Sequence, residues 1–158
     1  MASSSSSTRV RSNYDGFLSF CGIDTRRNFV NHLYKALCRE GIFTFIDDRE
    51  LEAGSEIKER LIEAIKTSQF AVVVISENYA TSPWCLEELR LIMELHSVNR
   101  IEVVPIFYGV APSDVRHQTG RFAVDFQMHE DRNPSMASQW RRALNQVANI
   151  SGFDSTTW

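Results

Sequence analysis

The segment from Phe70 to Ile75 (FAVVVI) constrains the fold of this chain more than any other stretch. It is an unbroken apolar run, and its last four residues are β-branched. Such runs are typical of strands that are covered on both faces, as in parallel sheets. We therefore expect this segment to lie at the centre of a sheet that has helices on both sides.

Strand-like and helix-like segments alternate along the rest of the chain. The other predicted strands are Tyr14 to Phe20, Ile42 to Ile46 and Ile101 to Tyr108. The predicted helices are Arg27 to Cys38, a helix capped by Ser55, Pro83 to about His96, part of Val115 to Met128, and about Ala137 to Ile150. This alternation predicts an α/β fold with right-handed β-α-β units, namely a flavodoxin-like, doubly wound parallel sheet in the order 2-1-3-4.

Glycine and proline refine this outline. Gly16 weakens the first predicted strand, and Gly41 closes the first predicted helix. Pro105 lies inside the last of the four strands and cannot donate a backbone hydrogen bond. We therefore expect one side of that strand to lack a full hydrogen-bond ladder.

Length and composition favour one domain and disfavour several classes of partner. The chain has 158 residues, of which 43% are hydrophobic, and this is enough for one well-packed domain. Its net charge of −3 offers no basic surface to nucleic acid or to an anionic membrane. No apolar run reaches transmembrane length, and the N-terminus lacks the apolar core of a signal peptide. We therefore expect a cytoplasmic or nuclear location.

The cysteines and histidines indicate neither a disulfide framework nor a metal site. Cys21, Cys38 and Cys85 are an odd number without C-x-x-C spacing, which fits a reducing compartment. The histidines show no ligand spacing with these cysteines, so we expect no zinc. The sequence also contains no P-loop, no G-x-G-x-x-G and no nucleophile-elbow spacing, so ordinary nucleotide and hydrolase motifs are absent.

Glu88 lies where a helix should be apolar. Ser82 is a candidate N-cap and Pro83 a candidate first helical residue, so a helix should begin there. At about 100° per residue, one broad face of this helix gathers the apolar residues Trp84, Cys85, Leu89, Leu91, Ile92 and Leu95. Glu88 falls inside that face, whereas Glu87 falls on the opposite, polar face. Because a buried carboxylate is costly unless something binds it, Glu88 is either part of a ligand site or a helix N-terminal carboxylate bonded to a loop.

The predicted topology brings Glu88 towards the turn after the first strand. In doubly wound sheets, ligands bind beyond the carboxyl ends of the strands where the winding reverses, here between strands one and three. In that turn, Gly22 could let backbone N–H groups approach an anion, and Arg26 could add charge. The alternative is a tight turn in which Arg26 lies on a solvated surface.

Five long motifs carry a family resemblance. They are YDGFLSFCGIDTRRNF, GIFTFIDD with the loop to Gly54, FAVVVISENYATSPWCLEEL, VVPIFYGVAPSDVRHQTG and QWRRALNQVANISG. With these motifs the chain resembles a plant Toll/interleukin-1 receptor (TIR) domain of intracellular immune receptors, over about Ser12 to Gly152. The resemblance implies a five-stranded sheet in the order 2-1-3-4-5. It divides the chain into a disordered Ser-rich leader (1–11), the TIR domain (12–152) and a C-terminal tail (153–158).

The resemblance implies cleavage of NAD⁺ to nicotinamide and ADP-ribose-type products in immune signalling. By motif, Glu88 is implied to be the catalytic residue, and the segment 47–54 corresponds to a loop that gates the site. The residues that match substrate-binding positions are Phe20, Gly22 and Arg26 in the turn after the first strand, and Ser82 and Trp84 beside the nicotinamide ribose. NAD⁺ is the substrate, and neither a cofactor nor a metal is implied.

The resemblance also implies that activity depends on self-association and on contacts with other TIR domains. One implied face contains Asn31 and His32 on the first predicted helix. A second contains Gly120, beside the last two helices. From the residues alone, His32 could be an ordinary surface histidine and Gly120 a turn that leads into a helix.

A rival interpretation is a catalytically weak interaction module of the same fold, which co-assembles with other TIR domains in disease-resistance signalling. Cys21 and Ile23 stand where such domains usually have arginine and glutamate, and Glu52 stands where a basic residue is common. These three residues favour the rival interpretation, because cysteine cannot replace the charge or the forked donors of arginine.

Overall fold

The computed structural model describes residues 14–22, 29–46 and 55–157. The predicted leader, Arg26 and the segment 47–54 lie outside the described residues, and so do Ile23 and Glu52. The described part of the chain contains the predicted sheet, the beginning of the turn after the first strand and the helix that carries Glu88.

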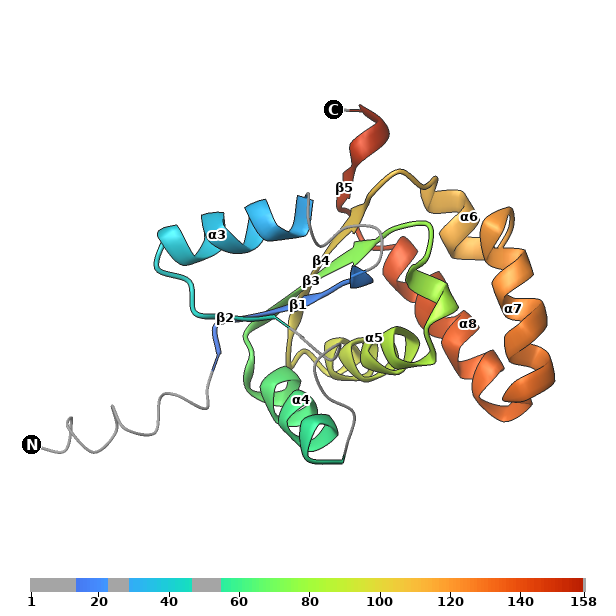
Figure 1. The fold of residues 1–158 in the computed structure, drawn as a ribbon, viewed down its shortest axis with the longest axis horizontal. Helices are drawn as coiled ribbons and strands as arrows, with labels where there is room; N and C mark the ends of the chain where they lie inside the picture. The colour runs from blue at the N-terminus through green and yellow to red at the C-terminus, as the bar shows by residue number, and fades with distance from the viewer. Residues whose placement is uncertain (1–13, 23–28, 47–54, 158) are drawn as a thin grey trace, which may run out of the picture.

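Five parallel strands within the described residues form one sheet in the order β2-β1-β3-β4-β5 (Figure 1). The strands are β1 (Gly16–Ser19), β2 (Thr44–Ile46), β3 (Phe70–Ile75), β4 (Glu102–Phe107) and β5 (Phe153–Asp154). The FAVVVI segment is the middle strand and pairs with both β1 and β4. The predicted flavodoxin-like order is confirmed, and so is the fifth strand that the family resemblance implies.

Helices cover both faces of the sheet (Figure 1). In the described residues they are α3 (Asn31–Arg39), α4 (Ser55–Thr67), α5 (Pro83–Ser97), α6 (Pro112–His117), α7 (Arg121–Arg132) and α8 (Pro134–Ala148), with short 3-10 helices η4 (Tyr79–Thr81) and η5 (Ser155–Thr157). Figure 1 shows α3 on one face of the sheet and α4, α5 and α8 on the other. Along β3, Val72 and Val74 pack with the core beneath α3, whereas Ala71 and Val73 pack with the core beneath α4, α5 and α8. The central strand is therefore buried on both faces, as its composition predicts.

The last helices begin at different residues from those predicted. The final helix starts at Pro134, three residues before the predicted Ala137, because proline is favourable at the first helical position. The partly helical segment consists of two helices, α6 and α7. Between them, Gln118 has a φ of 55° and Gly120 a φ of 62°, and such left-handed backbone cannot continue a right-handed helix.

Gly41 closes α3 as predicted. Its φ is +83°, a conformation that glycine adopts without steric penalty. The backbone N–H of Gly41 donates to Cys38 O at 3.0 Å, and that of Ile42 donates to Leu37 O at 3.0 Å. These bonds satisfy the last carbonyls of α3 and direct the chain into β2.

The ring of Phe70 packs directly over Gly16, where a larger residue would have its side chain. A Cβ atom on Gly16 would lie 2.4 Å from Phe70 Cε1, and the two residues are register partners in the β1–β3 pair. The first strand begins at Gly16 and is shorter than the predicted Tyr14 to Phe20. The aromatic ring of Phe70, on the central strand, thus fills the space that a side chain at position 16 would need.

Pro105 faces the side of β4 where pairing is incomplete, as predicted. The backbone amides of Glu102 and Tyr108 donate to carbonyls on the β3 side. Successive residues of a strand alternate in direction, so the backbone nitrogen of Pro105 faces β5. On that side, pairing starts only at Ile106, opposite Phe153. The strand β5 begins one residue after the expected end of the domain at 152, so the sheet continues into the segment expected to be a tail.

Candidate active site

The helix α5 begins where its sequence predicts. The Ser82 hydroxyl accepts a hydrogen bond from Cys85 N at 3.2 Å, and Pro83 is the first helical residue. This start sets the rotation of the helix and turns Glu88 inwards, where it is only 3% exposed. The prediction that Glu88 lies on the buried face of this helix is confirmed.

Glu87 lies on the other side of α5, as predicted, but water is not its only partner. It forms an ion pair with Arg90 at 3.1 Å and accepts a hydrogen bond from Trp140 Nε1 at 2.7 Å. Its carboxylate raises the pKa of Arg90, mainly through the side-chain hydrogen bond, while burial of the guanidinium acts in the opposite direction. The structure therefore gives the two adjacent glutamates different environments.

A hydrogen bond from the end of β1 fixes the carboxyl group of Glu88. Ser19, the last residue of β1, donates a hydrogen bond from Oγ to Glu88 Oε1 at 2.8 Å. Ser19 Oγ also lies 2.8 Å from Tyr79 Oη, and Tyr79 Oη lies within hydrogen-bond distance of Cys85 O, at 3.2 Å. Sequence reasoning missed Ser19 and Tyr79. A signal for Ser19 exists, since it is a polar residue in the otherwise apolar strand GFLS.

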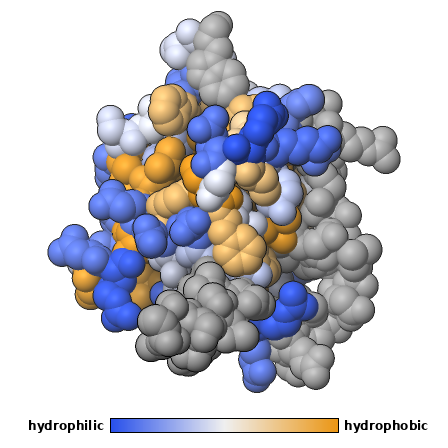
Figure 2. All heavy atoms as spheres, turned by 90° about the vertical axis from the view of Figure 1, so that its left-hand side faces the viewer, coloured by the Kyte–Doolittle hydropathy of each residue, from blue (hydrophilic) through white to orange (hydrophobic). Residues whose placement is uncertain are grey.

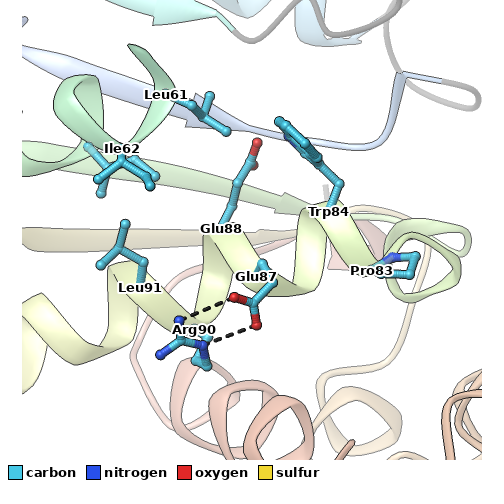
Figure 3. Close-up of a pocket in the computed structure, with 9 residues that line it drawn as sticks. Leu61, Ile62, Pro83, Trp84, Glu87, Glu88, Arg90 and Leu91 are labelled. Atoms are coloured by element: carbon cyan, nitrogen blue, oxygen red, sulfur yellow. Dashed lines mark hydrogen bonds and ion pairs between the residues drawn. The ribbon is translucent and has the colours of Figure 1, made fainter. Parts of the chain in front are cut away.

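A cavity opens beside Glu88 between α4 and α5. Its volume is about 390 Å³, and it is lined by Leu61, Ile62, Ile65, Pro83, Trp84, Glu87, Glu88, Arg90 and Leu91. In Figure 3 the Glu88 side chain points between Leu61 and Trp84, whereas Glu87 points away from it towards Arg90. The cavity therefore combines an apolar wall with a carboxylate that enters it from α5.

The predicted substrate-binding residues lie at different distances from this cavity. Trp84 lines it, and Ser82 caps the helix six residues before Glu88. Phe20 packs in the core beneath α3, on the other face of the sheet, and its carbonyl accepts a bond from Cys85 Sγ at 3.6 Å. Gly22 follows Phe20 closely but does not line the cavity, and Arg26 lies outside the described residues.

The turn that carries Tyr79 is fixed from α7. His129 Nε2 donates to Ala80 O at 2.7 Å, and both groups are buried. The His129 ring packs edge-to-face against Phe126 and Trp140, with centroid distances of 5.2 Å to each. Tyr79 is thus part of a rigid, packed turn.

The predicted self-association residues lie on two separate parts of the surface. Asn31 and His32 are exposed at the start of α3, and Gly120 is exposed at the start of α7. Figure 1 shows α3 and α7 at opposite ends of the molecule. Gly120 is also a turn that leads into a helix, and a Cβ atom there would lie 3.1 Å from Asp114 Oδ2.

The described residues contain no group of three or more His, Cys, Asp or Glu side chains that could hold a metal ion. In the same residues, no helix has both the length and the apolar character needed to cross a membrane. Cys21, Cys38 and Cys85 are not in disulfides, and Cys38 is the exposed one.

The order of the sheet and the position of Glu88 define a doubly wound α/β domain with a candidate ligand site where the winding reverses. Comparison with known families gives a more specific assignment, because the TIR domain family matches residues 13–158. The chain belongs to the TIR domain family.

Plant disease-resistance proteins are among its relatives. The chain is 52% identical over 155 residues to TMV resistance protein N of Nicotiana glutinosa, a match that covers 96% of this chain and 13% of that protein. It is 50% identical over 155 residues to disease resistance protein RPV1 of Vitis rotundifolia, covering 96% of this chain and 11% of that protein. The chain therefore spans only a small part of the length of these relatives.

Solved structures agree with the fold. The TIR domains in a structure described as the activated Roq1 resistosome directly recognizing the pathogen effector XopQ superpose with a TM-score of 0.81 at 53% identity, covering 90% of this chain and 87% of that one. The TIR domain of the Toll-related receptor TRR-2 from Hydra magnipapillata has a TM-score of 0.52 at 24% identity, covering 87% of this chain and all of that one. The second similarity concerns the fold alone.

Proposed function

We propose that this TIR domain acts in plant disease resistance by cleaving NAD⁺ to nicotinamide and ADP-ribose-type products, with Glu88 as the catalytic residue. The observation that carries the proposal is a carboxylate, 3% exposed, that lines a cavity between α4 and α5 and is bonded by Ser19 at the carboxyl end of β1. Carboxylates held in such sites are strong candidates for catalytic groups. The relatives named above support a role in disease resistance.

The chemistry requires a negative charge and no metal. When the bond between nicotinamide and ribose breaks, nicotinamide leaves as a neutral molecule, and positive charge develops on the ribose. A fixed carboxylate stabilises this oxocarbenium character and can accept hydrogen bonds from the ribose hydroxyls, as carboxylates do in glycoside hydrolysis. Glu88 has the charge and the position for this role.

The cavity suits one half of the dinucleotide. Ligand pockets usually measure about 300–1,000 Å³, and a cavity of about 390 Å³ suits nicotinamide riboside better than whole NAD⁺. Leu61 and Trp84 provide apolar walls that exclude water, which strengthens the electrostatic effect of Glu88. The rest of the dinucleotide would extend towards the turn that follows Phe20.

Activity in this proposal depends on self-association through the two surface regions that contain Asn31–His32 and Gly120. Two separate faces allow each domain to contact two neighbours, so larger assemblies can form. Figure 2 views the molecule from the side of β2 and α3, where apolar side chains are interspersed with polar ones. Mixed surfaces of this kind are typical of reversible interfaces, and the resistosome relative also supports assembly.

The second candidate function is a catalytically weak TIR–TIR interaction module. The observation that favours it is Cys21, which is 3% exposed and packs in the apolar core. An arginine at this position would bring a permanent charge and forked donors to the turn, and cysteine brings neither. Both candidates predict self-association, and they differ in whether Glu88 catalyses a reaction.

Nicotinamide release by concentrated protein tests the proposal. We expect wild type to release nicotinamide and Glu88→Gln to lose at least about 100-fold in rate, because it keeps the shape and removes the charge. Glu94→Gln is the matched control on the same helix, since Glu94 is 64% exposed and does not line the cavity. Wild-type activity equal to that of Glu88→Gln would instead favour the interaction module.

Light scattering tests the self-association part separately. We expect the mass of wild type to rise with concentration, and the rate per molecule to rise with it. His32→Ala should lower both, whereas Glu102→Gln, which alters an exposed residue at the start of β4, should lower neither. A rate per molecule that does not change with concentration would contradict dependence on assembly.

A further inference from the structure

A chain of hydroxyl groups connects Glu88 to the core behind the cavity. The contacts are Glu88 Oε1 to Ser19 Oγ at 2.8 Å, Ser19 Oγ to Tyr79 Oη at 2.8 Å, and Tyr79 Oη to Cys85 O at 3.2 Å. Ser19 and Tyr79 are both fully buried and do not line the cavity. Ser19 therefore contacts the carboxyl group from the side away from the cavity, and Tyr79 contacts Ser19.

Counting hydrogens shows that the direction of these bonds depends on the charge of Glu88. Each hydroxyl has a single hydrogen, and a carbonyl oxygen or an ionised carboxylate has none to donate. With Glu88 ionised, two hydrogens serve three contacts. With Glu88 protonated, three hydrogens serve three contacts, directed from Glu88 through Ser19 and Tyr79 to Cys85 O.

The distances favour the direction towards an ionised Glu88. With Glu88 ionised, one of the three contacts must lack a hydrogen. Bonds to a charged acceptor are stronger than neutral ones, so Ser19 donates to Glu88, and the contact of 3.2 Å between Tyr79 Oη and Cys85 O is the longest of the three. The longest contact ends at Cys85 O, a carbonyl in the first turns of α5 that also serves as a backbone acceptor within the helix. Losing the Tyr79 hydrogen there costs less than losing the Ser19 hydrogen at a buried carboxylate.

We infer that Ser19 and Tyr79 are positioning residues, and that their two hydroxyls form a relay which keeps Glu88 ionised and aimed into the cavity. Tyr79 donates to Ser19, Ser19 donates to Glu88, and each bond polarises the next. Protonation of Glu88 reverses both donors. The inference deepens the proposed function, on which its catalytic meaning rests.

The other described groups near Glu88 have different roles. The titratable and charged groups nearest to it in the described sequence and in the cavity lining are Cys21 just after β1, Tyr79 on η4, and Cys85, Glu87 and Arg90 on α5. Glu87 and Arg90 are paired with one another, and the cavity residues of α4 are apolar. Ser19 therefore donates a described hydrogen bond to Glu88, and donation to the charged form favours ionisation.

An NMR titration tests the relay whether or not the protein is active. In protein labelled with ¹³C at glutamate carboxyl carbons, the Glu88 signal is assigned by its absence in Glu88→Gln. We expect the midpoint of the Glu88 titration to rise by about one pH unit or more in Ser19→Ala, the size expected for a lost bond to a charged acceptor. Tyr79→Phe should raise it by less, because Ser19 still donates.

A matched control and a kinetic readout complete the test. Ser68→Ala removes a buried hydroxyl that bonds Ala64 O, far from Glu88, and should leave the titration unchanged.

If nicotinamide release occurs, the acidic limb of its pH profile should move with the NMR midpoint, with a larger fall in kcat than rise in KM. Titration midpoints in Ser19→Ala and Tyr79→Phe equal to that of wild type would overturn the relay, even in an active enzyme. A shifted midpoint in an inactive protein would support the relay and contradict only the proposed function.

Discussion

Trp140 on α8 donates a hydrogen bond to Glu87 on α5, with 2.7 Å between Nε1 and Oε2. Together with the Arg90 ion pair, this bond assigns Glu87 a structural role between two helices. The adjacent Glu88 enters the cavity instead. The two adjacent glutamates therefore have different partners, and Glu87 connects α5 to α8.

Replacing Trp140 with phenylalanine should therefore weaken the α5–α8 contact. We expect the free energy of unfolding to fall by about 2 kcal/mol, from the lost bond to a charged acceptor and from the smaller buried ring. Urea denaturation of Trp140→Phe, Glu87→Ala and the double variant measures the coupling. Strictly additive effects would show that the bond contributes nothing.

Replacing His129 with phenylalanine should destabilise the turn that carries Tyr79. The ring contacts with Phe126 and Trp140 would remain, but the buried Ala80 carbonyl would lose its donor, which costs about 1–3 kcal/mol. Thermal unfolding measures the loss. His117→Phe changes an exposed histidine and should stay within about 0.5 kcal/mol of wild type, and an equal effect of the two changes would refute the role given to His129.

Asp125 should make the stability of the protein depend on pH. Burial raises its pKa above the ordinary 3.8, while the charges of Arg121 and His129 act in the opposite direction. Its Oδ2 atom has no hydrogen-bond partner among the described residues. Since the folded state holds this proton more tightly than the unfolded state, the contribution of Asp125 to stability is greatest in acid and falls as the pH rises through the folded-state pKa.

Asp125→Asn removes this titration. We expect the stability of the variant relative to wild type to be greater at pH 7, where the carboxyl group carries more charge, and to decrease as the pH falls towards 3.8. Unfolding curves at several pH values measure the difference. An advantage that stays constant with pH would show that Asp125 is not the source.

The contact between Gly16 and Phe70 should make the first strand intolerant of side chains. Gly16→Val should lower the free energy of unfolding by about 1–3 kcal/mol, because its Cβ would overlap the Phe70 ring. Phe70→Leu introduced with it should recover part of the loss, although Phe70→Leu alone should destabilise. If the double variant is no more stable than Gly16→Val, the overlap is not the cause.

Much of the fold follows from local patterns in the sequence. The run from Phe70 to Ile75 predicts a central strand because burial on both faces selects an unbroken apolar run. The capping residues Ser82 and Pro83 fix the start of α5, and a fixed start sets which side of the helix Glu88 occupies. Pro134 marks the start of α8 in the same way, because proline is favourable at the first helical position.

Long-range contacts could not be predicted in this way. Ser19 lies 60 residues from Tyr79 and 69 residues from Glu88 in the chain, so no local spacing links them. The strand β5 has only two residues, which is too short for any periodic pattern. The second set of buried residues on α5, Leu86 and Met93, results from packing against α8, and a single helical period predicts only one buried face.

The central claim is that the carboxylate of Glu88 cleaves NAD⁺, and the rate of nicotinamide release tests it most directly. Wild type and Glu88→Gln are compared at one high protein concentration, after equal thermal unfolding curves show that both are folded. We predict release by wild type and a rate at least about 100-fold lower in Glu88→Gln. Equal rates in the two proteins would contradict the claim.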